Sequence, residues 1–173
     1  MPTATKSAGS AAPVTTGSLR PEHVWRALAK GSFAVIGYVT PTGRPRSSGV
    51  LYTVLDRRLY VVTDVDSWKA RDIPATGRVA VTVPVRRGGI MSLLFAIPPA
   101  TISFHGTASV FGPETPLAQG VLKRLGRLLP KERRDDCRII EIRPVGRFQT
   151  YGIGVDLLRM RDPSQSRAHV PVA

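Results

Sequence analysis

The most constraining feature of this chain is a series of short strand-like runs separated by turn signals. From residue 32 onward the sequence reads SFAVIGYVT, a PTGRP turn, SSGVLYTVL, a DRR turn and LYVVT. Each run is rich in β-branched and aromatic residues, and each turn carries Pro, Gly or Asp. This pattern predicts two antiparallel hairpins in series.

Helical signals are short and fall between the strand-like runs. Residues 21–31 (PEHVWRALAKG) predict a first helix with Pro at its start and Gly at its end. Residues 67–73 (SWKARDI) predict a second helix that Pro74 ends, and residues 116–129 predict a third from the spacing of their apolar side chains.

The remaining segments predict more strands. RVAVTVPV, TISFHGTASVFG and RIIEIRPVGRFQTYGIG each have strand character, and the last run predicts either a strand pair or one long bent strand. Because the strands do not alternate with full helices, a parallel α/β fold is disfavoured. A small antiparallel barrel with helices at its ends fits the order of elements best.

The length of 173 residues fits one domain, and 42% hydrophobic residues suffice for a core. We expect a barrel domain over residues 19–160. The tail at 1–18 is expected to be disordered, and the tail at 161–173 to be flexible.

The charge of the chain is strongly positive. Lys and Arg number 25 against 12 Asp and Glu, which gives a formal net charge of +13. Such a field attracts phosphates, acidic cofactors, nucleic acid or anionic membranes. Most of the cations are arginine, which holds carboxylates and phosphates in a bidentate manner. An anionic ligand is therefore expected, although codon usage alone can also enrich arginine.

The sequence lacks the motifs that are typical of several functional classes. The single cysteine, Cys137, excludes an intrachain disulfide framework and fits a reducing cytoplasm. The N-terminal segment has no apolar run typical of a signal peptide or membrane anchor. The three histidines are scattered, so we expect no metal site, and GxSxG and P-loop motifs are missing. We expect a cytoplasmic protein without a membrane span.

The run FAVIGYVTPTGRPRSSGVLYTVLDRRLYVVTDVDSWKARDIPATGRVAVTV, with HGTASV and RFQTYGIG further on, resembles the pyridoxamine-5′-phosphate-oxidase-like FMN-binding split barrels. Flavin and deazaflavin oxidoreductases belong to that superfamily. The resemblance extends from about Phe33 to Gly154. It implies a mainly β fold, a six- to seven-stranded antiparallel split barrel, that forms a homodimer with sites between the subunits.

The start of the second helix is the first candidate site. Ser67 is placed to cap this helix, which leaves free amides and the positive dipole end at the mouth of the barrel. Lys69 adds a positive charge and Thr63 a hydroxyl donor. The resemblance assigns the phosphate of FMN or of the deazaflavin coenzyme F-420 to this place, with Trp68 where several relatives have arginine. The alternative is a simple helix cap with a solvated lysine.

The second candidate segment is RPRSSGV at residues 44–50, which resembles the family strand that borders the isoalloxazine ring. Gly49 would let a flat ring approach the main chain. Arg46 and Ser48 are candidates for polar contacts, or else they are ordinary surface residues of an edge strand. The full set of expected cofactor-binding residues is Arg46, Ser47, Ser48, Gly49, Val50, Thr63, Ser67, Trp68 and Lys69.

The expected function is an FMN- or F-420-dependent oxidoreductase that transfers a hydride between the cofactor and a small organic substrate, with hydrophobic substrates included. The flavin carries the chemistry, so no dedicated acid or base is assigned. The alternatives are a non-catalytic flavin-, haem- or lipid-binding protein and a basic barrel that binds nucleic acid. Only 6% of residues are aromatic, which disfavours the latter.

Vitamin oxidation is not expected, because the C-terminal segment with arginine and histidine that holds the vitamin in the oxidase is not recognisable here. The apolar segment at residues 89–100 predicts either a lid over a hydrophobic substrate or packing inside the barrel or at a dimer interface.

Overall fold

The computed structural model describes residues 19–86, 100–125, 136–154 and 166–173. The strands in these parts are β1 (Phe33–Val39), β2 (Pro45–Leu55), β3 (Arg58–Asp64), β4 (Arg78–Val85), β5 (Ala100–Phe111), β6 (Cys137–Tyr151) and β7 (Arg167–Pro171). The helices are α1 (Pro21–Lys30), α2 (Trp68–Thr76) and α4 (Pro116–Leu125).

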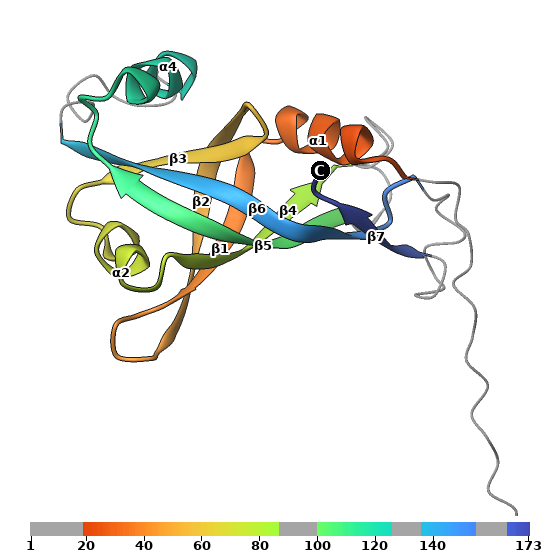
Figure 1. The fold of residues 1–173 in the computed structure, drawn as a ribbon, viewed down its shortest axis with the longest axis horizontal. Coiled ribbons are helices and arrows are strands. Elements are labelled where there is room, and N and C mark those ends of the chain that lie inside the picture. The colour runs from red at the N-terminus through yellow and green to blue at the C-terminus, as the bar shows by residue number, and fades with distance from the viewer. Residues whose placement is uncertain (1–18, 87–99, 126–135, 155–165) are drawn as a thin grey trace, which may run out of the picture.

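All the described strands belong to one antiparallel sheet in the order β3-β2-β1-β4-β5-β6-β7. Strand β3 also pairs with β6, so the first six strands of this order form a closed barrel and β7 lies outside it on β6 (Figure 1). The predicted mainly β, antiparallel split barrel is therefore confirmed.

Alternation along each strand separates the barrel core from its outer face. In β1, Ala34, Ile36 and Tyr38 are buried, whereas Val35 and Val39, at alternate positions, are exposed. A two-residue turn joins β2 to β3, with Asp56 and Arg57 both at positive φ. Turns of this kind match the twist of paired strands. The predicted hairpins thus form with one face toward the core.

Strand β6 is long enough to pair with three neighbours. It pairs with β5 on one edge, while β3 and β7 share its other edge. A register shift between Ser103 and His105 accompanies its pairing with β5. Gly106 lies next to this shift, and a Cβ there would approach the Arg143 carbonyl oxygen to 2.8 Å. Close approach of β5 and β6 therefore requires glycine at this position.

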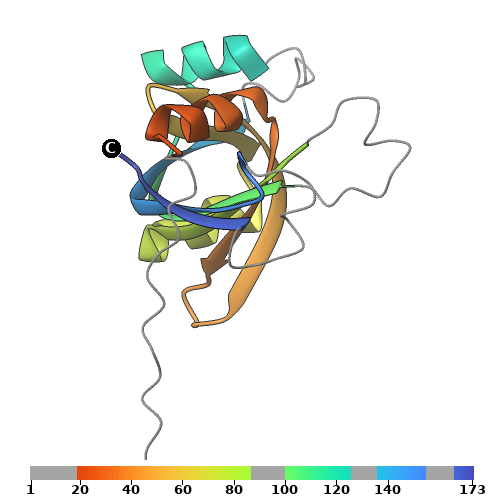
Figure 2. The same ribbon diagram turned by 90° about the vertical axis from the view of Figure 1, so that its right-hand side faces the viewer.

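The helices cover the barrel from two sides. Helix α1 packs against β2, β4 and β7, α4 packs against β2 and β3, and α2 lies on the other side, near β1 and β5 (Figures 1 and 2). A second apolar cluster lies between α4 and the barrel wall and consists of Tyr60, Ala118, Val121, Leu125 and Ile139.

Helix α2 extends past the predicted end at Pro74, as far as Thr76. Gly77 then adopts a left-handed conformation, with φ of 60°, and donates its N–H to the Ile73 carbonyl oxygen. The left-handed glycine, rather than the proline, terminates this helix.

The C-terminal segment corrects another prediction. Residues 167–171 were expected within a flexible tail, but they form β7, with Val170 opposite Phe148 of β6 and almost fully buried. The Trp25 indole also donates a hydrogen bond to the Val172 carbonyl oxygen at 3.1 Å. A short run flanked by polar residues lacks a periodic signal, so the partner strand decides its structure.

Two predicted segments lie outside the described residues. They are the N-terminal tail at 1–18 and nearly all of the apolar segment at 89–100, whose last residue, Ala100, begins β5. The predicted end of the third helix, at 126–129, also lies there. Within the described ranges, no helix has the length and apolar character needed to cross a bilayer.

A buried charge network joins β3 to β6. The Glu141 carboxylate is buried and accepts hydrogen bonds from the Tyr60 hydroxyl at 2.9 Å, from Arg58 Nη1 at 3.2 Å and from Arg143 Nε at 2.5 Å. Burial acts to raise the pKa of Glu141, but the bonds from Arg143 and Tyr60 and the two guanidinium charges outweigh it. The pKa therefore lies below its ordinary value of 4.5.

We predict that Glu141→Gln lowers the free energy of unfolding by ~1–3 kcal/mol at pH 7, because two guanidinium groups lose their buried partner. Since the folded-state pKa lies below 4.5, the carboxylate stabilises the fold above that pH. The stabilisation disappears as the pH falls through the folded-state pKa. Urea denaturation of the wild type and of Glu141→Gln over a pH series measures whether the difference in their free energies of unfolding disappears at low pH.

The control is Glu22→Gln. Glu22 pairs with Arg57 at 4.0 Å, and both side chains are exposed, so no measurable loss of stability is expected. An equal loss in the two variants at every pH would contradict the assignment.

Candidate functional site: a cationic pocket at the start of helix α2

The start of α2 is organised by two hydroxyl groups. The Ser67 hydroxyl accepts the Ala70 N–H at 3.3 Å and thereby caps the helix. Thr63, at the end of β3, donates its hydroxyl proton to the Ser67 oxygen at 2.9 Å. Ser67 also donates its own N–H to the Asp64 carbonyl oxygen at 3.1 Å. The strand end therefore fixes the position and direction of the helix.

The first turn of α2 borders a cavity. The N–H groups of Trp68 and Lys69 have no acceptor among the described residues. They border a cavity of about 310 Å³ lined by Tyr38, Arg46, Ser47, Ser48, Ser67, Trp68 and Lys69, which we call the anion pocket. Free amides, a helix dipole and two cations make this pocket suited to a negatively charged group.

Arg46 is held in place from two directions. Its guanidinium carbon lies 4.3 Å from the centroid of the Trp68 ring, and its Nε lies 3.9 Å from Asp72 Oδ2. Asp72 is buried, and this oxygen has no hydrogen-bond partner. A buried carboxylate without other partners favours a nearby cation, so Asp72 keeps Arg46 at the pocket wall.

Trp68, the first residue of α2, has an exposed side chain. In this chain the exposed indole carries two guanidinium groups, because Arg71 also lies 4.5 Å from the ring centroid. Contacts of this kind attract cations to aromatic faces. The uncharged indole therefore holds two positive charges beside the pocket.

Six of the nine predicted site residues line the anion pocket, namely Arg46, Ser47, Ser48, Ser67, Trp68 and Lys69. Thr63 lies behind them and orients Ser67. Val50 is buried in the core. Gly49 lies beneath the Phe33 ring, whose Cε2 would be 3.0 Å from a Cβ on the glycine. The structure thus places a phenyl ring where a flavin ring was expected to approach Gly49.

Two residues of the site were missed from the sequence. Tyr38 faces the barrel core and still borders the pocket. Asp72 is one helical turn beyond Trp68, so the two share a face of α2. Its position on the same helix face as Trp68 could have identified Asp72 from the sequence.

A second cavity adjoins the first. It measures about 520 Å³, and Tyr38 and Arg46 line both. Its walls include Val39, Ala80 and Val145, with Arg78 and His105 as polar members. The pair of cavities can therefore receive a ligand with an anionic end and a flat apolar body.

The fold and site define a class: closed antiparallel barrels with a cationic pocket at a helix start on the rim. The family model described as pyridoxamine 5′-phosphate oxidase matches residues 21–151, and the chain belongs to this family. No curated protein matches the sequence.

Solved structures share the fold. The heme storage protein HutZ from Vibrio cholerae has a TM-score of 0.60 and 15% identity, with coverage of 78% of this chain and 96% of its own. For an F420 reductase, the TM-score is 0.54 and the identity 19%, with coverage of 71% and 93%. A FAD-binding protein from Mesorhizobium loti has a TM-score of 0.59 and 15% identity, with coverage of 73% and 91%.

We predict that Ser67→Ala lowers the free energy of unfolding by ~1 kcal/mol, because α2 loses its cap. Ser67→Gly should cost only a few tenths of a kcal/mol, since glycine is tolerated at this position. Chemical denaturation of the purified variants measures both values.

The matched comparison is Thr115→Ala, which removes the hydroxyl that accepts the Ala118 N–H of α4 at 3.2 Å. It should destabilise the protein to a similar degree while leaving the anion pocket intact. A Ser67→Ala variant as stable as the wild type would show that the cap does not order α2.

Proposed function

We propose that this protein binds FMN or the deazaflavin coenzyme F-420 and acts as an oxidoreductase on a small organic substrate. The observation that carries the proposal is the anion pocket, which Trp68 and Lys69 of the first helical turn line beside the Arg46 cation. A phosphate group fits that chemistry. Membership of a family described by an oxidase supports it.

Four residues of the pocket have a definite task in this proposal. The Trp68 and Lys69 amides and the Ser48 hydroxyl donate hydrogen bonds to the phosphate. Lys69 and Arg46 neutralise its charge. The bound flavin accepts or donates the hydride, while the chain orients it and limits access of water.

The larger apolar cavity is the place we propose for the ring of the cofactor or for the substrate. Gly37 and Ala80 are small residues that pair across β1 and β4, so a planar group can lie close to the main chain on the outer face of the sheet. Because Phe33 covers Gly49, the ring is proposed over β1 and β4 rather than over the middle of β2.

We also propose a homodimer, formed through the outer face of β1 and β2. Val35, Val39 and Leu51 lie on this face and are 38%, 41% and 47% exposed. Neighbouring apolar side chains on one sheet face mark an interaction surface. A second copy covering this face would also enclose the adjoining cavity.

A non-catalytic role is the second proposal, because proteins with this fold include a heme storage protein and a FAD-binding protein. The absorption spectrum of the protein as purified separates flavin from haem. Turnover with a reduced nicotinamide or with reduced F-420 then separates an enzyme from a carrier.

We predict that Lys69→Ala weakens the affinity for FMN or F-420 by ~1–3 kcal/mol, the scale of a lost charge-assisted hydrogen bond. Fluorescence titration of each cofactor into the purified protein measures the change. The exposed Lys123 in the last turn of α4 provides a matched control, and Lys123→Ala should leave the affinity unchanged. If neither cofactor binds the wild-type protein at micromolar concentration, the proposal is wrong.

We predict that Val35→Glu converts the dimer to a monomer, because a carboxylate in the centre of the apolar face would lose its hydration on association. Size-exclusion chromatography with light scattering measures the mass. Leu117→Glu adds the same charge to an exposed apolar position on α4 and should leave the dimer intact. A monomeric wild-type protein would refute the interface.

A further inference from the structure

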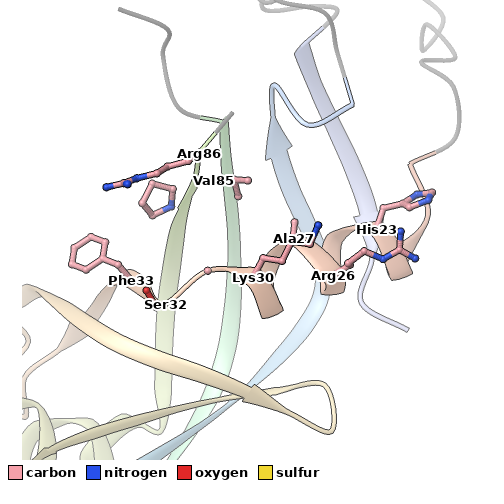
Figure 3. Close-up of a pocket in the computed structure, with 10 residues that line it drawn as sticks. His23, Arg26, Ala27, Lys30, Ser32, Phe33, Val85 and Arg86 are labelled. Carbon is pink, nitrogen blue, oxygen red and sulfur yellow. The ribbon is translucent and has the colours of Figure 1, made fainter. Parts of the chain in front are cut away.

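A groove runs beside α1, at the other end of β1 from the anion pocket. It has a volume of about 900 Å³, within the usual range of ligand sites. Its residues come from α1, from Ser32 and Phe33 at the start of β1, and from the end of β4 (Figure 3). Phe33 here and Tyr38 at the anion pocket are about 17 Å apart along the strand. The groove is therefore a separate site.

Four basic side chains line this α1 groove. His23, Arg26 and Lys30 follow one another at spacings of three and four residues and share a face of α1. Arg86 lines the groove from just past the end of β4 (Figure 3). The acidic residue of α1, Glu22, pairs with Arg57 instead. Among the described residues, no carboxylate pairs with Arg26, Lys30 or Arg86.

His23 contributes a donor rather than an acceptor. Its Nδ1 accepts the Arg20 N–H at 3.4 Å, so the proton of the neutral ring lies on Nε2. This tautomer suits contact with an anion and opposes ligation of a metal through Nε2.

The rest of the groove is apolar. Ala27, Pro84 and Val85 line it, and Phe33 adds an aromatic wall that is 46% exposed. The edge of the Phe33 ring lies over the main chain of Gly49. The apolar surface and the row of cations border the same cavity.

We propose that the α1 groove binds an amphipathic organic anion, namely an acyl chain that ends in a carboxylate. The chain would lie against Ala27, Phe33 and Val85, and Lys30 and Arg86 would hold the carboxylate. A small inorganic anion would make no use of the apolar wall, and a neutral hydrocarbon would make no use of the cations. Along α1, the seven helical steps from His23 to Lys30 span about 10 Å, enough for a medium-length chain.

The test is a calorimetric titration of octanoate into the purified full-length protein at low ionic strength. Three partial ligands serve as comparisons. Acetate lacks the acyl chain, inorganic phosphate lacks both the chain and the carboxylate, and octanol lacks the charge. We expect octanoate to bind about tenfold or more tightly than each of them. Added salt should weaken octanoate binding, since exposed charges are screened.

Charge reversal locates the site. The double variant Lys30→Glu/Arg86→Glu should lower octanoate affinity by about tenfold or more, whereas Lys123→Glu should change it by less than about twofold. All three positions are exposed, so the variants should keep the wild-type melting temperature, which is measured alongside.

Several results would overturn the inference. Octanol binding as tightly as octanoate would indicate an apolar groove without a role for the cations. Phosphate binding as tightly would indicate plain attraction of anions, and an unaffected double variant would place octanoate elsewhere.

FMN and F-420 titrations of the same double variant keep this inference distinct from the proposed function. Lys30 and Arg86 do not line the anion pocket, so cofactor affinity should stay unchanged in this variant. Conversely, Lys69→Ala should leave octanoate binding unchanged, because Lys69 does not line the groove.

Discussion

The pairing of β3 with β6 is the contact on which the rest of this molecule depends. Six residue pairs join the two strands, from Leu59 opposite Ile142 to Asp64 opposite Cys137. Without this pairing β3 would be an open edge, and the apolar interior of the sheet would lose one wall. Closure also fixes the end of β3, and the hydrogen bond from the Thr63 hydroxyl to Ser67 then positions the cap of α2. The direction of the helix dipole thus follows from the closed sheet.

Part of the positive charge of the chain gathers at two places. At the anion pocket Arg46, Lys69 and Arg71 gather around one indole and one helix start. Along the α1 groove the cations follow a helix face beside apolar side chains. Both are geometries in which a negative ligand would find exposed positive charge.

Most of the barrel could be predicted because its strands alternate and its turns carry Pro, Gly or Asp. The start of α2 was predictable for the same local reason, since Ser67 has the side chain that caps helices. Features that depend on distant contacts were not. Strand β7 forms because β6 offers an unpaired edge and Trp25 reaches Val172.

The candidate site shows the same division between local and distant information. Ser67, Trp68 and Lys69 could be predicted from the helix cap, which is a local feature, whereas Arg46, Ser47 and Ser48 were expected only from the family resemblance. Coverage of Gly49 by Phe33 depends on the register of β1 against β2, in which Val35 is opposite Gly49 and Phe33 lies diagonally across from it. The role of Asp72 depends on Arg46, which lies far away in sequence. No local pattern contains these pairings.

The lone thiol of the chain lies at one end of the β3–β6 seam. Cys137 is 1% exposed and faces Asp64 across the two strands. A thiol reagent cannot reach this sulfur while the strands remain paired, so its rate of alkylation follows the opening of the seam. Because the chain has no other cysteine, the alkylation rate of Cys137 reports on the opening of the barrel at this one place without any engineered label.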